Sequence, residues 1–160
     1  YGGIEGAKSF QRKVEDSSGI KISIGSHSTS AALETYGGVK NIAFLSPYYP
    51  VANKEVKKYF EECDFKVIRD VCLECKSWTA IAEVDESSLR EVILKQLDGD
   101  DIDAIVQVGT NLSMIRLAAN LEKLLSKPVI AINTATYWHA LRSNDINDKV
   151  DGFGKLLSGF

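Results

Sequence analysis

Asp103 to Asn133 read DAIVQVGTNLSMIRLAANLEKLLSKPVIAIN, and this stretch decides the fold class. Residues 104–108 are a short apolar run of the kind that forms a buried strand. A Gly-Thr-Asn turn follows, residues 112–125 repeat apolar side chains at helical spacing, and residues 128–133 are a second apolar run. Two buried strands joined by a helix predict a parallel βαβ unit with a right-handed crossover.

The same alternation continues on both sides of this unit. Upstream, residues 39–46 predict a buried strand, residues 52–63 an amphipathic helix, and residues 65–75 a strand that runs into a loop. Residues 87–97 predict another helix with one apolar face, and residues 134–142 predict a last helix. Strands that alternate with helices throughout the chain predict an α/β fold with a mainly parallel sheet.

The first forty residues give a less regular pattern. Residues 6–16 have helical spacing, and residues 20–24 (IKISI) alternate as a strand does. Ser28-Thr29-Ser30 is predicted to cap a helix that ends at Gly37-Gly38. A parallel α/β unit normally opens with a strand, but this chain starts at Tyr1 with a predicted helix. We therefore expect the N-terminal part of the protein to precede Tyr1.

Composition excludes several classes of protein. The chain has 160 residues, of which 44% are apolar and 26% charged, and its net charge of −3 comes from interspersed acids and bases. This is not the basic footprint of a nucleic-acid-binding protein. No apolar run approaches the roughly 18 residues of a membrane span, and no signal peptide is visible. Three cysteines are too few for a disulfide scaffold and predict a reducing, cytoplasmic location.

Small polar residues gather where three predicted strands end, in the stretches 23–30 (SIGSHSTS), 44–50 (FLSPYYP) and 107–111 (QVGTN). Ligands of open α/β sheets bind beyond the carboxyl ends of the strands, and the N-terminus of a following helix favours an anion. The candidate hydrogen-bond donors at this edge are Ser46, Tyr48, Thr110, Asn111, Asn133 and Thr134. They predict a site for a small carboxylate or phosphate. The alternative is that these residues only cap helices.

Four other residues carry possible chemistry. Cys72-x-x-Cys75 could be half of a zinc site or a redox pair, but no second pair of this spacing exists, so a structural role is favoured. His139 could act as a general acid or base, although its helical aromatic surroundings (YWHALR) are more typical of packing. His27 lies in a Ser-rich stretch that favours a surface position.

The order of these motifs resembles the Asp/Glu racemase superfamily, especially its branch of maleate cis-trans isomerases and arylmalonate decarboxylases. The motifs are SPY at 46–48 with Asn53, GTN at 109–111, and KPVIAINTATYWHALR at 127–142. The resemblance covers the chain from about Ile20 to its C-terminus. It implies flavodoxin-like, parallel-sheet lobes of the Asp/Glu racemase type with the active site between them.

The resemblance also implies an incomplete first lobe. Residues 1–38 would be the C-terminal part of that lobe, residues 39–133 the second lobe, and residues 134–160 a return helix and tail packing on the first lobe. The first family cysteine would lie upstream of Tyr1. Gly109 stands where the family has its second cysteine, so the two-cysteine mechanism is not available in this form. One upstream cysteine could still add to a double bond, allow rotation and leave.

By the same resemblance, Tyr48 and Thr110 are expected to be catalytic. The residues expected to bind or orient the substrate are Gly109, Asn111, Asn53, Asn133 and Thr134. The implied activity is an isomerisation, racemisation or decarboxylation of a small carboxylate or dicarboxylate, without metal or organic cofactor, in a possible homodimer. One alternative is a non-catalytic relative that only binds the carboxylate. A weaker one places Cys72 and Cys75 in an intermolecular zinc site.

Overall fold

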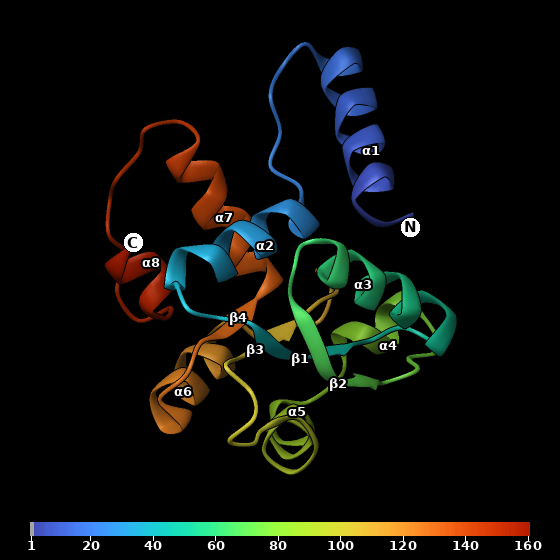
Figure 1. Ribbon diagram of the computed structural model, residues 1–160, viewed down its shortest axis with the longest axis vertical. Helices are drawn as coiled ribbons and strands as arrows, with labels where there is room; N and C mark the ends of the chain where they lie inside the picture. Colours follow the sequence, from blue (N-terminus) through green and yellow to red (C-terminus); the bar gives the residue numbers. More distant parts are fainter. Residues whose placement is uncertain (1) are drawn as a thin grey trace.

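The computed structural model of the protein describes residues 2–160. Four strands form one sheet in the order β2-β1-β3-β4, and every neighbouring pair is parallel (Figure 1). The strands are β1 (Asn41–Ser46), β2 (Lys66–Cys72), β3 (Ala104–Gln107) and β4 (Val129–Ala131). The predicted α/β fold with a parallel sheet is confirmed. Because all strands run the same way, their carboxyl ends lie at one edge of the sheet.

Helices cover both faces of this sheet. They are α1 (Gly3–Ser18), α2 (Gly25–Tyr36), α3 (Pro50–Glu62), α4 (Trp78–Ala82), α5 (Glu86–Val92), α6 (Ile115–Leu125), α7 (Ile132–Arg142) and α8 (Lys155–Gly159), with a π-helical turn, η1 (Ile93–Leu97), continuing α5. The start of α5 follows from its sequence, because the Asp85 carboxylate accepts the Ser88 N–H at 2.9 Å. Within residues 2–160, no helix is both long and apolar enough to cross a membrane.

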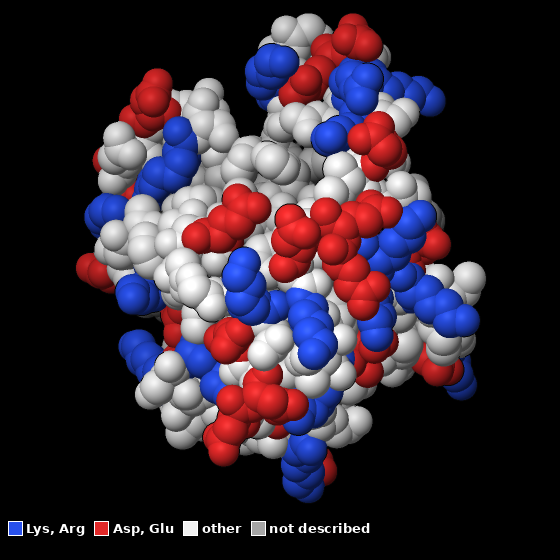
Figure 2. Space-filling view, viewed as in Figure 1, with Lys and Arg blue, Asp and Glu red and all other residues white. Residues whose placement is uncertain are grey.

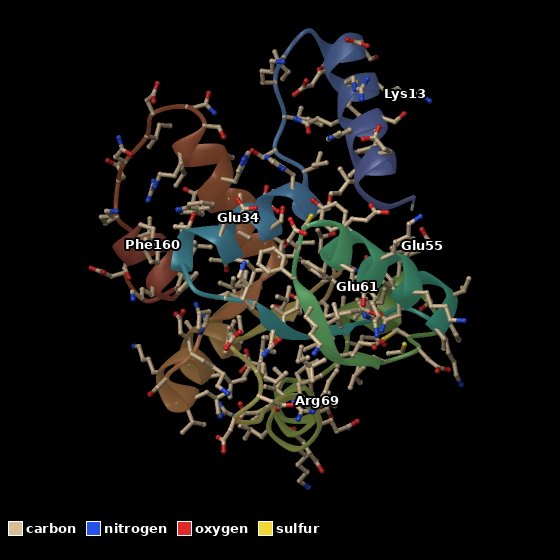
Figure 3. The ribbon with its side chains drawn as sticks, in the orientation of Figure 1. Lys13, Glu34, Glu55, Glu61, Arg69 and Phe160 are labelled. Carbon is tan, nitrogen blue, oxygen red and sulfur yellow. The ribbon has the colours of Figure 1, made fainter. Side chains whose placement is uncertain are left out.

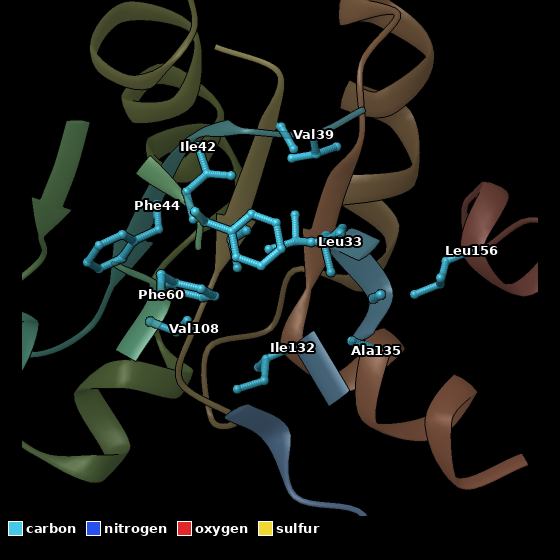
Figure 4. Close-up of a cluster of buried hydrophobic side chains, with 14 of the residues drawn as sticks. Leu33, Val39, Ile42, Phe44, Phe60, Val108, Ile132, Ala135 and Leu156 are labelled. Atoms are coloured by element: carbon cyan, nitrogen blue, oxygen red, sulfur yellow. The ribbon is translucent and has the colours of Figure 1, made fainter. Parts of the chain in front are cut away.

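Two apolar cores lie on opposite faces of the sheet. Alternate residues of β1 point to opposite sides, so Ile42 and Phe44 join one core and Ala43 and Leu45 the other. The first core packs the sheet against α2, α3, α7 and α8 (Figure 4). The second packs it against α4, α5, η1 and α6. Burial on both faces explains why the strands are continuous apolar runs.

The strand predicted at residues 20–24 is wrong. These residues are an extended link between α1 and α2 and pair with no strand within residues 2–160. Side chains of α1 satisfy the Ile22 backbone instead: its N–H donates to Glu15 Oε1 at 3.1 Å, and its carbonyl accepts from Gln11 Nε2 at 3.3 Å. Alternation of apolar and polar residues in the sequence therefore did not indicate a strand here, since Ile20 is exposed and Ile24 is buried in an unpaired link.

Two predicted helix starts are also displaced. Helix α2 begins at Gly25, so Ser28, Thr29 and Ser30 lie inside it and are buried rather than capping it. The helix after the Gly-Thr-Asn turn begins at Ile115 and not at Leu112. Leu112 is fully buried and its N–H closes a turn onto the Gly109 carbonyl at 3.0 Å, which delays the helix.

Helix α1 stands away from the sheet and contacts the body of the protein mainly through α3 (Figure 1). The α3 carboxylates hold its N-terminus, since Glu62 Oε2 accepts the Ile4 N–H at 2.6 Å and Glu55 Oε2 accepts the Gly2 N–H at 3.0 Å. Phe10, on this helix, keeps 59% of its surface exposed.

Charged side chains of both signs are interspersed on the face shown in Figure 2.

Candidate functional site

A cavity of about 720 Å³ lies between α1 and the carboxyl edge of the sheet. Its walls come from α1, the start of α2, one side of α3, and the turns that follow β1 and β3. Of the residues predicted for the site, Tyr48, Gly109 and Thr110 line it. Sequence reasoning missed Ser26 and Thr29, which also line it and whose signal was the Ser-rich start of α2.

The turn after β1 carries Tyr48 into the cavity wall. The Tyr48 N–H donates to Ser46 Oγ at 3.1 Å, and the Ser46 hydroxyl donates to Asn53 Oδ1. The Asn53 amide donates in turn to Asp70 Oδ2 at 2.6 Å. Ser46 of β1 and Asn53 of α3 are buried where this strand and helix meet, so Asn53 supports this turn and does not line the cavity. Pro47, also buried, restricts the backbone between Ser46 and Tyr48.

The turn after β3 presents backbone to the same cavity. Gly109 has a φ of +96°, and a Cβ there would lie 2.6 Å from two carbons of the Pro47 ring. It would also lie 3.7 Å from the Tyr48 hydroxyl, so the two turns meet. Within residues 2–160, the peptide N–H groups of Gly109, Thr110 and Asn111 donate to no protein acceptor. Three consecutive available N–H groups form a concavity suited to an anion.

The amide side chains of three residues hold this second turn in place. Gln107 Nε2 donates to the Val108 and Gly109 carbonyls, each at 2.8 Å. Asn133 Nδ2 donates to the Thr110 carbonyl at 2.9 Å, and Asn111 Nδ2 donates to the Trp78 carbonyl. Asn111 and Asn133 thus support the turn and lie outside the cavity wall. Sequence reasoning missed Gln107, whose signal was a polar residue within the apolar run of β3.

Thr134 lies in the first turn of α7 and is also outside the cavity wall. Its side chain is 6% exposed, and its hydroxyl has no hydrogen-bond partner within residues 2–160. The structure therefore brings together three of the seven predicted site residues at the cavity and places the other four behind or beside it.

The ionisable groups of the cavity wall are few. Burial raises the pKa of Tyr59 to about 12, so this phenol stays neutral in the physiological range. Lys13 on α1 and Glu55 on α3 are the charged residues of the wall (Figure 3). No cysteine or histidine of residues 2–160 lines it.

The three cysteines lie elsewhere and are free thiols. Burial raises the pKa of Cys63, Cys72 and Cys75, which makes each a weak nucleophile at neutral pH. In the described part of the chain, no three histidine, cysteine, aspartate or glutamate side chains gather as a metal site would require.

The two histidines lie side by side, away from the cavity wall. His27 and His139 have ring centroids 5.1 Å apart, and His139 Nδ1 is 2.7 Å from Ser23 Oγ. Burial first, and then the neighbouring His27, lowers the pKa of His139. The pair joins the link before α2 to α7, as the packing interpretation of His139 predicted. His27 is exposed, although it lies in the first turn of α2 and not in a strand-end loop.

Comparison with known proteins agrees with this fold. A family model described as arylmalonate decarboxylase matches residues 1–157. A curated maleate isomerase from Geobacillus stearothermophilus is 29% identical over 76% of this chain and 49% of its own length. The chain thus spans about half the length of the curated relatives it matches.

Comparison with solved structures also finds maleate isomerases. A mutant maleate isomerase from Pseudomonas putida, crystallised with maleate, superimposes with a TM-score of 0.76 at 30% identity over 88% of this chain and 55% of its own. A mutant Nocardia farcinica maleate cis-trans isomerase with a covalently bound succinylcysteine intermediate gives a TM-score of 0.88 at 21% identity, over 99% of this chain and 66% of its own. The second likeness shows the fold alone.

Proposed function

Because the chain belongs to the arylmalonate decarboxylase family, we propose that it takes part in a cofactor-independent isomerisation, racemisation or decarboxylation of a small carboxylate or dicarboxylate. The observation that carries this proposal is the meeting of two turns at the cavity. One brings the Tyr48 phenol, and the other brings the peptide N–H groups of residues 109–111.

These donors suit a reaction in which negative charge develops next to a carboxylate. Addition to a carbon–carbon double bond, removal of an α-proton and loss of carbon dioxide all leave electrons that the carboxylate oxygens can accept. Fixed donors in a cavity stabilise such charge without reorganising during the reaction. We assign this role to Tyr48, Thr110 and the Gly109 backbone. Asn53, Asn111 and Asn133 then act by holding the two turns.

The chemistry also needs a nucleophile or base, and we propose a cysteine thiol upstream of residues 1–160. In an isomerisation, its sulfur would bond to one alkene carbon, and the electron pair would move onto the adjacent carboxylate. Rotation about the resulting single bond and loss of the thiolate would give the trans product. The 29% identity to a curated maleate isomerase supports an isomerisation of this kind.

The lining of the cavity supports a substrate that has an apolar part. Ala7, Val56 and Phe60 give it apolar wall beside the polar turns. An acid with an apolar substituent, as in an arylmalonate, would place that substituent against this wall.

We also propose the division into lobes that the sequence suggested. The four strands found in residues 2–160 all fall within residues 39–133, which supports a second lobe there. Residues 1–38 and 134–160 would belong to the first lobe. Packing of α2 along α7, and of α7 against α8, supports this grouping.

A second candidate function is binding without turnover. It is favoured by the cavity wall, which in residues 2–160 contains donors for an anion but neither thiol nor imidazole. A regulatory or storage protein of this family would need only the donors.

Calorimetric titration of full-length protein with maleate and with phenylmalonate tests both candidates. Replacing Tyr48 with phenylalanine should weaken binding about 10- to 100-fold, because a hydrogen bond to a charged group contributes about 1.5–3 kcal/mol. Tyr137→Phe is the matched control, since Tyr137 is 54% exposed on α7 and outside the cavity wall. Unchanged affinity in Tyr48→Phe would mean that the Tyr48 phenol does not bind the carboxylate.

Turnover separates the two candidates. Proton NMR of the same acids would detect fumarate formed from maleate, or a decarboxylated product from phenylmalonate. Product formation supports the enzyme, whereas saturable binding without product or solvent-proton exchange supports the binding protein.

A further inference from the structure

We propose that Asp70 is a positioning residue: its carboxylate sets the direction of the hydrogen bonds that fix the Tyr48 turn. This inference rests on the proposed carboxylate site and extends it to a residue outside the cavity wall. The decisive observation is the continuous series of contacts from Asp70 through Asn53 and Ser46 to the Tyr48 backbone.

The fold places these groups on one face of the sheet. Asp70 on β2 lies beside Phe44 on β1, two residues before Ser46. Alternate residues of a strand share a face, so Asp70 and Ser46 both point toward α3. Asn53 lies in the first turn of α3 and bridges them.

The direction of each hydrogen bond follows from the carboxylate. An ionised carboxylate can only accept, so the group that Asn53 turns toward Asp70 must be its NH₂, at 2.6 Å. The Asn53 carbonyl oxygen therefore faces Ser46, and the single hydroxyl proton of Ser46 must point to it. The lone pairs of Ser46 Oγ are then left to accept the Tyr48 N–H at 3.1 Å.

Without the Asp70 carboxylate, nothing obliges these hydrogen bonds to keep their donor-to-acceptor direction. The two ends of an asparagine amide have nearly the same shape, so Asn53 could turn its NH₂ toward Ser46. The Ser46 proton would then lose its acceptor and compete with the Tyr48 N–H for the same space. Ser46 is 0% and Asn53 1% exposed, so water cannot compensate for a reversed bond.

The Tyr48 turn has a second connection to the same strand. Just after β2, the Cys75 N–H donates to the Pro47 carbonyl at 3.0 Å, and the Glu74 N–H donates to the Tyr48 carbonyl at 3.3 Å. The loop after β2 thus holds the carbonyls of the turn, while Asp70 acts on the Tyr48 N–H. Together they fix the backbone from which the phenol reaches toward Gly109.

Asp70→Asn tests the inference with little risk to folding, because the residue is exposed and the change preserves its shape. We expect amide hydrogen exchange of Tyr48 in the ligand-free protein to speed up about tenfold. Exchange at Val108, whose N–H donates to the Leu45 carbonyl, should stay unchanged. If the mutation loosened the whole region, amide exchange would speed up at both Tyr48 and Val108. Affinity for phenylmalonate should fall about three- to tenfold.

Asp101→Asn is the matched control, because Asp101 is an exposed carboxylate that pairs with Arg69 and not with this network. It should change neither exchange nor affinity. If Tyr48 exchange in Asp70→Asn equals that of wild type, the inference is overturned, even where Tyr48→Phe still weakens binding. If Asp70→Asn speeds Tyr48 exchange in a protein that binds no carboxylate, the positioning role stands and the proposed function falls.

Discussion

The turn after β1 and the turn after β3 meet at one cavity but contribute different chemistry. The first presents a side chain, Tyr48, and its backbone is fixed by a buried network. The second presents peptide N–H groups, with Gly109 at a φ of +96° and Gln107 and Asn133 holding its carbonyls. Parallel strands bring the two ends together, but each turn is built by its own local interactions.

The difference predicts how each turn responds to mutation. A side-chain donor is removed by one conservative replacement that leaves the backbone in place. Backbone donors remain whatever the side chain is, and they are lost only when the turn itself is displaced. Mutations that test the second turn must therefore act on its conformation or on its supports.

The largest effect is expected for Gly109→Ala. Its Cβ would meet the buried Pro47 ring at 2.6 Å in a backbone conformation that disfavours side chains. Strain and overpacking each cost about 1–3 kcal/mol, so the free energy of unfolding should fall by about 2–6 kcal/mol. Gly109→Cys should lower the free energy of unfolding for the same reason, because its Cβ would occupy the same position. A cysteine at this position therefore requires the turn to adopt another conformation. Urea unfolding measures the change.

Gly37→Ala is the control for this prediction. Gly37 has a φ of +69°, but no atom lies within 4 Å of where its Cβ would be, so only the conformational cost remains. Equal destabilisation by the two alanines would show that contact with Pro47 is unimportant. Carboxylate binding should be lost in Gly109→Ala and retained in Gly37→Ala.

A smaller effect is expected for Asn133→Ala, which removes one support of the second turn. Loss of the bond to the Thr110 carbonyl should cost about 0.5–1.5 kcal/mol and weaken carboxylate binding about two- to tenfold. Asn144→Ala removes a similar bond, from Asn144 Nδ2, just after α7, to the Ala140 carbonyl in its last turn at 2.8 Å. Isothermal titration calorimetry with the carboxylate should show weaker binding in Asn133→Ala than in Asn144→Ala. Equal affinities in the two variants would argue that Asn133 does not support the turn.

The smallest effect is expected from pH. Peptide N–H groups do not titrate, and the pKa of Tyr59 is raised to about 12, so its phenol stays protonated throughout the mildly alkaline range. If the peptide N–H groups of residues 109–111 contribute most of the binding free energy, affinity for a fully ionised carboxylate should change less than about twofold between about pH 8 and pH 9. A severalfold loss over that interval would mean that a titrating side chain, and not these N–H groups, holds the ligand.

Much of the fold was readable from the sequence because it depends on local patterns. The apolar runs at 39–46 and 104–108 became β1 and β3, and the alternation of strand and helix gave a parallel sheet. The strand predicted at 20–24 failed because a strand needs a neighbour, and side chains of α1 satisfy the Ile22 backbone instead. Pairing is a long-range property that alternation cannot reveal.

The candidate site divides in the same way. Sequence by itself determined that Tyr48 and the Gly-Thr-Asn turn would lie at one edge of the sheet, because residues that end parallel strands must do so. Only the tertiary structure decided that Asn53, Asn111 and Asn133 face carbonyls, hydroxyls and carboxylates of the protein. Burial obliges the Asn53 amide to find partners within the protein, whereas the exposed Asn111 and the partly buried Asn133 reach carbonyls that lie 33 and 23 residues away in the chain.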